Sequence, residues 1–221
     1  MTSSIGKSLL GALWTASVAL AINACALTSK AEVVDVRYFN PERISPRINR
    51  ATLAVTRQMT IPTLQLRLGR VSSGPNLRER IAYRNSAYEL GYYEDLHWTE
   101  RPEIYVRREF GRSLFEAHAL RRVLAGAAPT LDVELIAFEE VRLKASRVAR
   151  IQLKVILYED DGVLFEDTLT IDRPVMGQKP TIEDVVAAMA MALDAASEQV
   201  ALRVQRSLAA KQVAPFADAV P

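Results

Sequence analysis

The sequence predicts an α/β domain in which a mixed, antiparallel-rich β-sheet is covered by two main helices. Several segments between residues 63 and 171 alternate apolar and polar residues, which is the period of a half-buried strand. Two other segments place apolar residues three and four positions apart, which is the period of an amphipathic helix. A sheet that carries both helices is the simplest arrangement that buries all of these apolar faces.

The first strands are predicted from short alternating segments. Val33–Phe39 is the first candidate, and Thr63–Val71 follows with leucines at alternate positions. Arg80–Arg84 and Ala87–Tyr93 are two more short strands. The polar residues 85–86 between them predict a tight turn.

A helix is predicted directly after these strands. Thr99 is a suitable N-cap residue, and Pro102 then falls in the first turn, where its missing N–H group costs nothing. The residues that share the predicted apolar face are Val106, Phe110, Leu114 and Ala117. We expect this helix to end near His118.

The later strands are longer and include a hairpin. Leu131–Val141 and Val148–Tyr158 both alternate, and Val163–Ile171 runs back after an Asp-Gly turn at residues 160–162. An Asp-Gly pair between alternating segments is the strongest short-range signal of a hairpin in this chain. Ala119–Leu124 is a further candidate strand.

A long helix is predicted near the end of the chain. It opens at Pro180 and Thr181, where Thr181 is a good cap and Glu183 and Asp184 place acidic groups near the positive end of the helix. Its apolar stripe is formed by Val185, Met189, Leu193, Ala196, Val200, Val204 and Leu208.

Composition and motifs argue against catalysis. The chain has 221 residues, of which 49% are apolar and 24% charged, so it is an ordinary globular chain of one domain or two small ones. It contains no phosphate-binding GxxxxGK[ST] loop, no GxGxxG and no GxSxG motif. His97 and His118 are its two histidines, which are too few ligands for a usual metal site. We therefore predict no catalytic residue and no metal.

The charged residues give no sign of nucleic-acid binding or acid–base chemistry. The net charge is +2, and no basic stripe dominates the sequence. Glu139 and Glu140 are expected to point to opposite faces of a strand, and nothing beside them would raise the pKa of one selectively. The pair Asp160 and Asp161 belongs to the hairpin turn.

The first residues are typical of an export signal. Met1–Ser8 carries one positive charge, Leu9–Ile22 carries none, and the chain's one cysteine, Cys25, follows. The residues Ile-Asn-Ala-Cys resemble a bacterial lipobox, which predicts a covalent lipid, such as palmitate, on Cys25 and no other cofactor. Ala26 after the cysteine favours the outer membrane by analogy with lipoprotein sorting. Cleavage by ordinary signal peptidase and an uncleaved membrane anchor are the alternatives.

These observations divide the chain into four parts. Residues 1–24 are predicted to be the lipoprotein signal peptide, and residues 25–62 the lipidated N-terminus and a tether. Residues 63–211 form the predicted folded domain, and residues 212–221 a flexible tail.

The aromatic residues before the first helix are the densest feature of the sequence. They are Tyr83, Tyr88, Tyr92, Tyr93 and Trp98. Tyrosine and tryptophan are favoured at interfaces, but the same spacing fits a core between the sheet and the helix, and we favour the core. Tyr92, Tyr93 and Trp98 are the candidate partner-binding residues.

The segment Arg80–Pro102, RIAYRNSAYELGYYEDLHWTERP, resembles the ABC-type transport auxiliary lipoproteins, the paraquat-inducible auxiliary group. Their pattern has a Tyr-Arg pair, an aromatic strand, a tryptophan and a helix opened by proline. The later strand LDVELIAFEEV, the hairpin and the last helix follow in the family's order. The resemblance implies an α/β sandwich akin to the amino-terminal domain of TolB.

The resemblance also implies a role without catalysis. Such lipoproteins accompany an ABC ATPase, a permease and a substrate-binding protein with an MCE (mammalian cell entry) domain, which move lipid or other hydrophobic molecules across a Gram-negative envelope. We therefore expect an outer-membrane lipoprotein that docks the periplasmic partner, and a ring-shaped partner would favour a homo-oligomer. The alternative is a periplasmic carrier that holds a lipid in its own apolar pocket. A hydrolase is the weakest hypothesis, because no nucleophile and base can be named.

Overall fold

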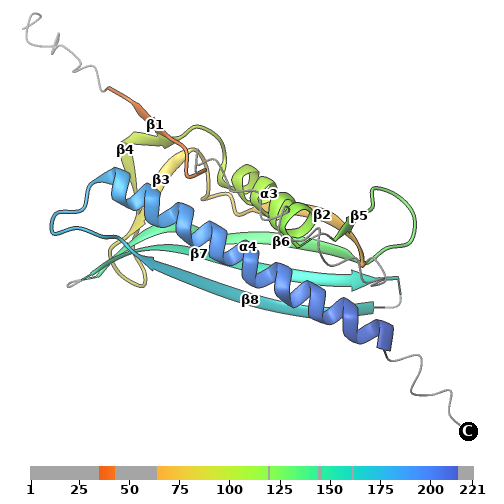
Figure 1. Cartoon of the computed structure of the whole chain (residues 1–221). Helices are drawn as coiled ribbons and strands as arrows, with labels where there is room; N and C mark the ends of the chain where they lie inside the picture. Colours follow the sequence, from red (N-terminus) through yellow and green to blue (C-terminus); the bar gives the residue numbers. More distant parts are fainter. Residues whose placement is uncertain (1–34, 43–63, 119, 144–145, 161, 214–221) are drawn as a thin grey trace, which may run out of the picture. The chain divides into compact units, whose positions relative to one another are not determined.

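Two helices lie against one face of a mixed eight-stranded sheet, as the sequence predicts (Figure 1). The computed structural model describes residues 35–42, 64–118, 120–143, 146–160 and 162–213. The signal peptide, Cys25, most of the predicted tether and the end of the predicted tail lie outside these residues. Residues 36–221 group together as one compact unit.

The elements follow the predicted order of strands, helix, long strands and long helix. The strands are β1 (Arg37–Phe39), β2 (Gln65–Ser73), β3 (Arg80–Arg84), β4 (Leu90–Trp98), β5 (Arg121–Arg122), β6 (Thr130–Arg142), β7 (Arg147–Glu159) and β8 (Gly162–Pro174). The helices are α3 (Pro102–Arg112), continued by the π-helical turn η2 (Ser113–Ala117), and α4 (Ile182–Val213).

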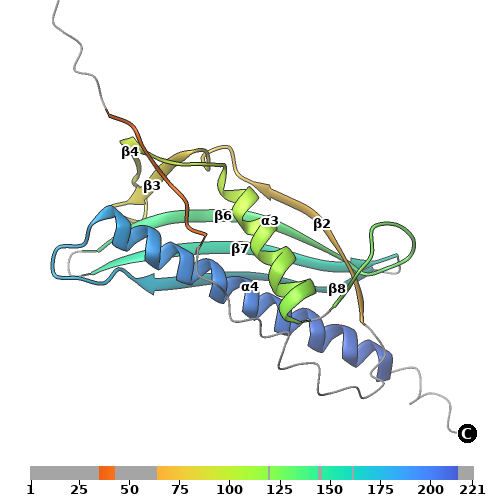
Figure 2. The same ribbon diagram turned by 45° about the horizontal axis from the view of Figure 1, so that its top comes forward.

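The long strand β6 organises the sheet. One of its edges pairs with β7 along its whole length, and β7 pairs in turn with β8. The other edge is shared by two strands that lie end to end, because β2 pairs with the first half of β6 and β3 with the last residues. β4 and β1 extend the sheet beyond β3, and β5 extends it beyond β2. The strands β1 and β5 therefore lie on the same side of β6, opposite β8 (Figure 1). Figure 2 shows β2, β6, β7 and β8 following one another across the sheet.

The core lies between the sheet and the two helices. All seven apolar residues of the predicted stripe on α4 are buried, and they pack against β7 and β8. Ile151, Leu153, Val155 and Leu157 on β7 are 0% exposed, which confirms the predicted alternation. Residues 182–211 are long and apolar enough to cross a bilayer by composition, but this burial identifies α4 as a core helix.

The start of α3 differs from the prediction. Pro102 opens the helix as expected, but the N-cap residue is Arg101, and it makes no side-chain cap hydrogen bond. Thr99, the predicted cap, lies outside the helix with its hydroxyl 2.7 Å from the hydroxyl of Tyr105. The Tyr105 hydroxyl also accepts the N–H of Glu100, so a buried tyrosine holds the approach to the helix instead of a cap. The helical segment ends at Ala117, next to the predicted His118.

The β3–β4 turn is longer than predicted. β4 begins at Leu90 rather than Ala87, because residues 85–89 form the connection. Ser86 accepts the N–H groups of Tyr88 and Glu89 at 3.3 and 3.2 Å, which removes both groups from strand pairing. The start of α4 agrees with the prediction, since Asp184 accepts the N–H and hydroxyl of Thr181 at 2.8 and 3.1 Å.

The edge strands differ strongly in length. β1 and β5 have three and two residues, whereas β8 has thirteen, and β8 pairs with β7 alone. In the middle of β8, the Asp167 carboxylate accepts the N–H of Thr168 at 2.8 Å and forms an ion pair with Arg203 of α4. β1 falls within the stretch predicted as tether, at the strand predicted for Val33–Phe39, and it pairs with β4.

Candidate functional site

The predicted aromatic cluster is divided between the core and the surface. Trp98, at the end of β4, is 1% exposed and packs edge-on against Tyr105 and Phe138, with ring centroids 6.3 and 5.2 Å apart. Tyr88, in the β3–β4 turn, is 98% exposed. Tyr92 is half-buried and donates its hydroxyl to the carbonyl of Asn76 at 2.9 Å. The core interpretation is therefore right for Trp98, and Tyr88 is the most exposed member of the aromatic cluster.

Tyr93 belongs to a buried polar cluster around Glu140. Its hydroxyl donates to the Glu140 carboxylate at 2.7 Å, and Arg142 donates to the same carboxylate at 3.1 Å. Arg147 at the start of β7 completes the set with an ion pair to Glu140 and a hydrogen bond of 2.9 Å to the carbonyl of Pro180. The cluster thus joins β4, β6 and β7 to the segment that precedes α4.

Aromatic rings cover the arginine of this cluster. The Arg142 guanidinium carbon lies 3.8 Å from the ring centroid of Tyr83 and 4.9 Å from that of Tyr93. The two rings meet edge-on with centroids 5.3 Å apart. Stacking of a cation on aromatic faces adds to the attraction from the carboxylate.

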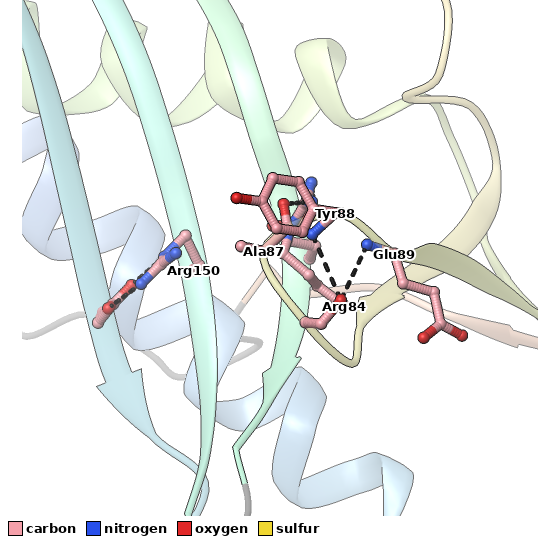
Figure 3. A network of polar contacts seen from close by, with 8 residues as sticks. Arg84, Ala87, Tyr88, Glu89 and Arg150 are labelled. Carbon is pink, nitrogen blue, oxygen red and sulfur yellow. Dashed lines mark hydrogen bonds and ion pairs between the residues drawn. The ribbon is translucent and has the colours of Figure 1, made fainter.

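Glu139 faces the opposite side of the sheet and binds a different arginine, as strand alternation predicts. Arg84 of β3 donates to its two carboxylate oxygens at 2.6 and 3.1 Å, which is the bidentate geometry of strong pairs. Arg84 also donates to the carbonyl of Ala87 at 3.2 Å, so it ties the turn that carries Tyr88 to the sheet (Figure 3). Arg150 on β7 forms a second bidentate pair with Asp172 at 2.8 and 2.7 Å.

The pKa shifts of the cluster follow from these contacts. Burial by itself raises the pKa of Glu140, but hydrogen bonds from Arg147 and Tyr93 and the charge of Arg142 outweigh it, so the pKa of Glu140 is lowered. Burial raises the pKa of Tyr93, and its hydrogen bond to Glu140 raises it further. Glu140 is therefore an anion and Tyr93 a neutral donor at neutral pH.

This geometry suits a structural role. Glu139 and Glu140 are 2% and 0% exposed, and each has its arginine partners, so neither is free to move a substrate proton. Among the described residues, no group of three or more histidine, cysteine, aspartate or glutamate side chains could hold a metal. His118 contacts Glu198 and Gln205 on α4, and His97 meets Tyr38 of β1 edge-on, with ring centroids 5.7 Å apart.

Two depressions on the described surface have linings that include charged residues, whereas a third, beside the β5–β6 loop, is lined mainly by apolar residues. One is lined by Phe165, Arg203, Arg206 and Ser207, and another by Arg70, Ser72, Asp132, Val133, Glu134, Lys154 and Ile156. Lipid-binding pockets are instead enclosed and mostly apolar. The space between sheet and helices is occupied by core side chains.

Sequence reasoning did not identify the arginines that hold this cluster. Glu140 is joined to Tyr93 and Arg147 across 47 and 7 residues, and Glu139 to Arg84 across 55. A usable signal was present, since acids in the middle of an apolar strand must be paired if they are buried. The partner-binding role predicted for Tyr92, Tyr93 and Trp98 stays a prediction.

Two helices packed on one face of a mixed sheet, with the buried Glu139 and Glu140 paired to arginines, define an α/β sandwich. The chain belongs to the family of ABC-type transport auxiliary lipoprotein components, whose model matches residues 48–201. That family suggests a non-catalytic role in an ABC transport system and a place in the envelope of Gram-negative bacteria.

Solved structures share this fold. The chain resembles the crystal structure of a Xanthomonas campestris protein of the DUF330 family with a TM-score of 0.57 and 18% identity, over 69% of this chain and 91% of that one. It also resembles an uncharacterized protein with a TM-score of 0.56 and 14% identity, over 67% of this chain and 96% of that one. The comparison with curated proteins gave no significant match.

Proposed function

We propose that the chain is an outer-membrane lipoprotein, anchored through Cys25, that docks the MCE-domain partner of an ABC-type lipid transport system at its periplasmic end. Membership of the auxiliary lipoprotein family is the observation that carries this proposal. The position of Cys25 directly after the uncharged segment 9–22 supports it.

The length of the chain between anchor and domain limits the reach of the domain. Cys25 and Val36 are eleven residues apart, and β1 begins at Arg37. Eleven residues span at most about 36–40 Å. The side of the sheet that carries β1 is therefore held within about 40 Å of the lipid, and β8 lies on the opposite side of the sheet.

The β3–β4 turn is the docking element that we propose. Tyr88 is 98% exposed, and tyrosine is among the residues that contribute most to interfaces. The turn is fixed before binding, because Arg84 ties it to Glu139 and Ser86 holds its N–H groups. A preorganised turn loses little conformational freedom when a partner binds.

The anchor is tested by labelling with radioactive palmitate. We expect label on the wild-type protein and none on the Cys25→Ser variant, which should leave the outer-membrane fraction. Equal label on both proteins would contradict the anchor.

The docking element is tested by co-purification from envelope extracts, in which the wild-type chain should recover an MCE-domain protein. Tyr88→Ala should weaken recovery of that protein at least tenfold, the scale of about 1.4 kcal/mol for an interface residue. Tyr158→Ala, at 37% exposure on β7, is the matched control and should keep full recovery. Unchanged recovery with Tyr88→Ala would exclude the turn as the docking element.

A further inference from the structure

The β5–β6 loop presents an uncharged apolar tip. Residues 123–129 have the sequence VLAGAAP. Leu124 is 86% exposed, and residues 125–127 beside it are exposed too. A single exposed leucine is ordinary on a protein surface, but four consecutive exposed residues without a polar side chain are not.

Backbone contacts hold the base of this loop in place. The N–H of Val123 donates to the carbonyl of Leu66 at 3.0 Å, and the N–H of Arg67 donates to that of Pro129 at 2.8 Å. The Arg67 guanidinium also bonds the carbonyl of Gly126 at the tip, where φ is +89°. The loop is thus held with Leu124 outward.

Arginines without carboxylate partners lie on β5, on β2 beside it and on α3, which packs against β2. They are Arg67 and Arg70 on β2, Arg107 on α3, and Arg121 and Arg122 on β5, and within the described part of the chain none of them forms an ion pair. Arg107 donates to the carbonyl of Gly69 at 3.0 Å, and Arg122 lies 4.3 Å from the ring centroid of Phe115. The nearby Glu159, which lines the depression beside the loop, is paired with Lys211.

The loop lies on the same side of the sheet as the start of the folded domain. β5 and β1 are both on the side of β6 that is opposite β8. The two strands lie at opposite ends of this edge, because β1 adjoins β4 and β5 adjoins β2. A bilayer that faces the whole edge would therefore also meet the loop after β5.

We infer that the β5–β6 loop is a second membrane contact, in which Leu124 enters the bilayer and Arg67, Arg121 and Arg122 bind the phosphates of anionic lipids. This inference rests on the proposed lipid anchor. An apolar tip next to exposed arginines matches an anionic lipid surface, because the acyl region accepts leucine and arginine pairs well with phosphate.

The test places a dye on the loop of the full chain. Leu124→Cys is labelled with a polarity-sensitive nitrobenzoxadiazole dye and incorporated into vesicles of phosphatidylethanolamine and phosphatidylglycerol. Because a lipidated Cys25 has no free thiol, mass spectrometry should find one dye per chain. The matched control is Val163→Cys, which is 60% exposed on β8.

We expect the dye at residue 124 to emit at shorter wavelength on vesicles and to be quenched by nitroxide-labelled lipid, and the dye at residue 163 to do neither. The contribution of the arginines is measured in chains that also carry Cys25→Ser, so that no lipid anchor holds them on the vesicle. In these dye-labelled chains, Arg121→Gln together with Arg122→Gln should lower vesicle binding by about fivefold per arginine. Arg78→Gln together with Arg80→Gln, at exposed positions near β3, is the matched control.

Three results would overturn the inference. If the dye at residue 124 stays in water while the chain remains vesicle-bound, the loop contact is wrong and the anchor stands. If polyglutamate shifts this dye and vesicles do not, the patch binds an acidic protein. If two dyes are incorporated per chain, Cys25 is free, and the anchor fails together with the inference.

Discussion

The two ends of β6 use arginine in opposite ways. At the β3–β4 end, arginines are bound to buried carboxylates, as Arg147 is to Glu140 and Arg84 to Glu139. At the β2–β5 end, Arg121 and Arg122 are exposed and have no carboxylate partner among the described residues. Arginine therefore stabilises the fold at one end and remains available for a ligand at the other. The presence or absence of a buried carboxylate beside it distinguishes the two roles.

The largest expected effect comes from Glu140→Gln. This change leaves Arg142 and Arg147 without their shared anion in a buried site, and breaking such a pair costs about 3 kcal/mol. Urea unfolding should show this loss in the midpoint with an unchanged slope. Glu134→Gln, at an exposed position of the same strand, is the control and should stay within about 0.5 kcal/mol of wild type. A loss of similar size in both variants would show that the buried Glu140 cluster contributes no more stability than an exposed glutamate.

The pH dependence of the free energy of unfolding also tests the role of Glu140. The pKa of Glu140 is lowered in the folded state, so its contribution is present above the ordinary glutamate pKa and is lost as pH falls through the lowered value. The free energy of unfolding should therefore fall in acid, and Glu140→Gln should remove part of that slope. Unfolding measured at several pH values between neutral and strongly acidic checks this. An identical slope in the variant would contradict the pKa direction.

Tyr93→Phe is expected to have a smaller effect. It removes one hydrogen bond of 2.7 Å to the Glu140 carboxylate but leaves the arginines in place, so we expect a loss of about 1.5 kcal/mol. Tyr158→Phe, at 37% exposure, is the control in the same thermal unfolding experiment. An unchanged midpoint for Tyr93→Phe would mean that the arginines alone satisfy the carboxylate.

The smallest effect is expected at the other end of β6. Arg121→Gln together with Arg122→Gln removes two exposed cations that form no ion pair among the described residues, so the free energy of unfolding should stay within about 0.5 kcal/mol of wild type. The melting temperature checks this. A clear destabilisation would show that these arginines stabilise the fold, as Arg84 and Arg147 do at the β3–β4 end.

Local periodicity was enough to predict most elements. β3 was placed to the residue, and the apolar stripe from Val185 to Leu208 was correct because burial on one helix face imposes its own spacing. The cap at Thr99 was wrong, because the hydroxyl of Tyr105, in the first turn of α3, bonds Thr99 and Glu100 outside the helix. Periodicity predicts which residues share a face of a helix or strand, but it does not predict which side chains they contact.

The candidate site was less predictable for this reason. That Glu139 and Glu140 face opposite sides follows from the strand alone, but their partners lie on β3, β4 and β7. The end-to-end arrangement of β2 and β3 along β6, which brings Tyr93 near Glu140, depends on long-range strand pairing. The exposure of Tyr88 depends on the length of its turn, which the Ser86 hydroxyl determines.

The contact between Asp167 and the N–H of Thr168 has a consequence for how copies of this chain can associate. A thirteen-residue border strand is a natural template for an incoming strand from a neighbouring molecule. Here the central amide is already engaged by a carboxylate that α4 holds through Arg203. Strand exchange or fibre growth along this border must first release that carboxylate, so this edge is a poor template for a second copy of the chain.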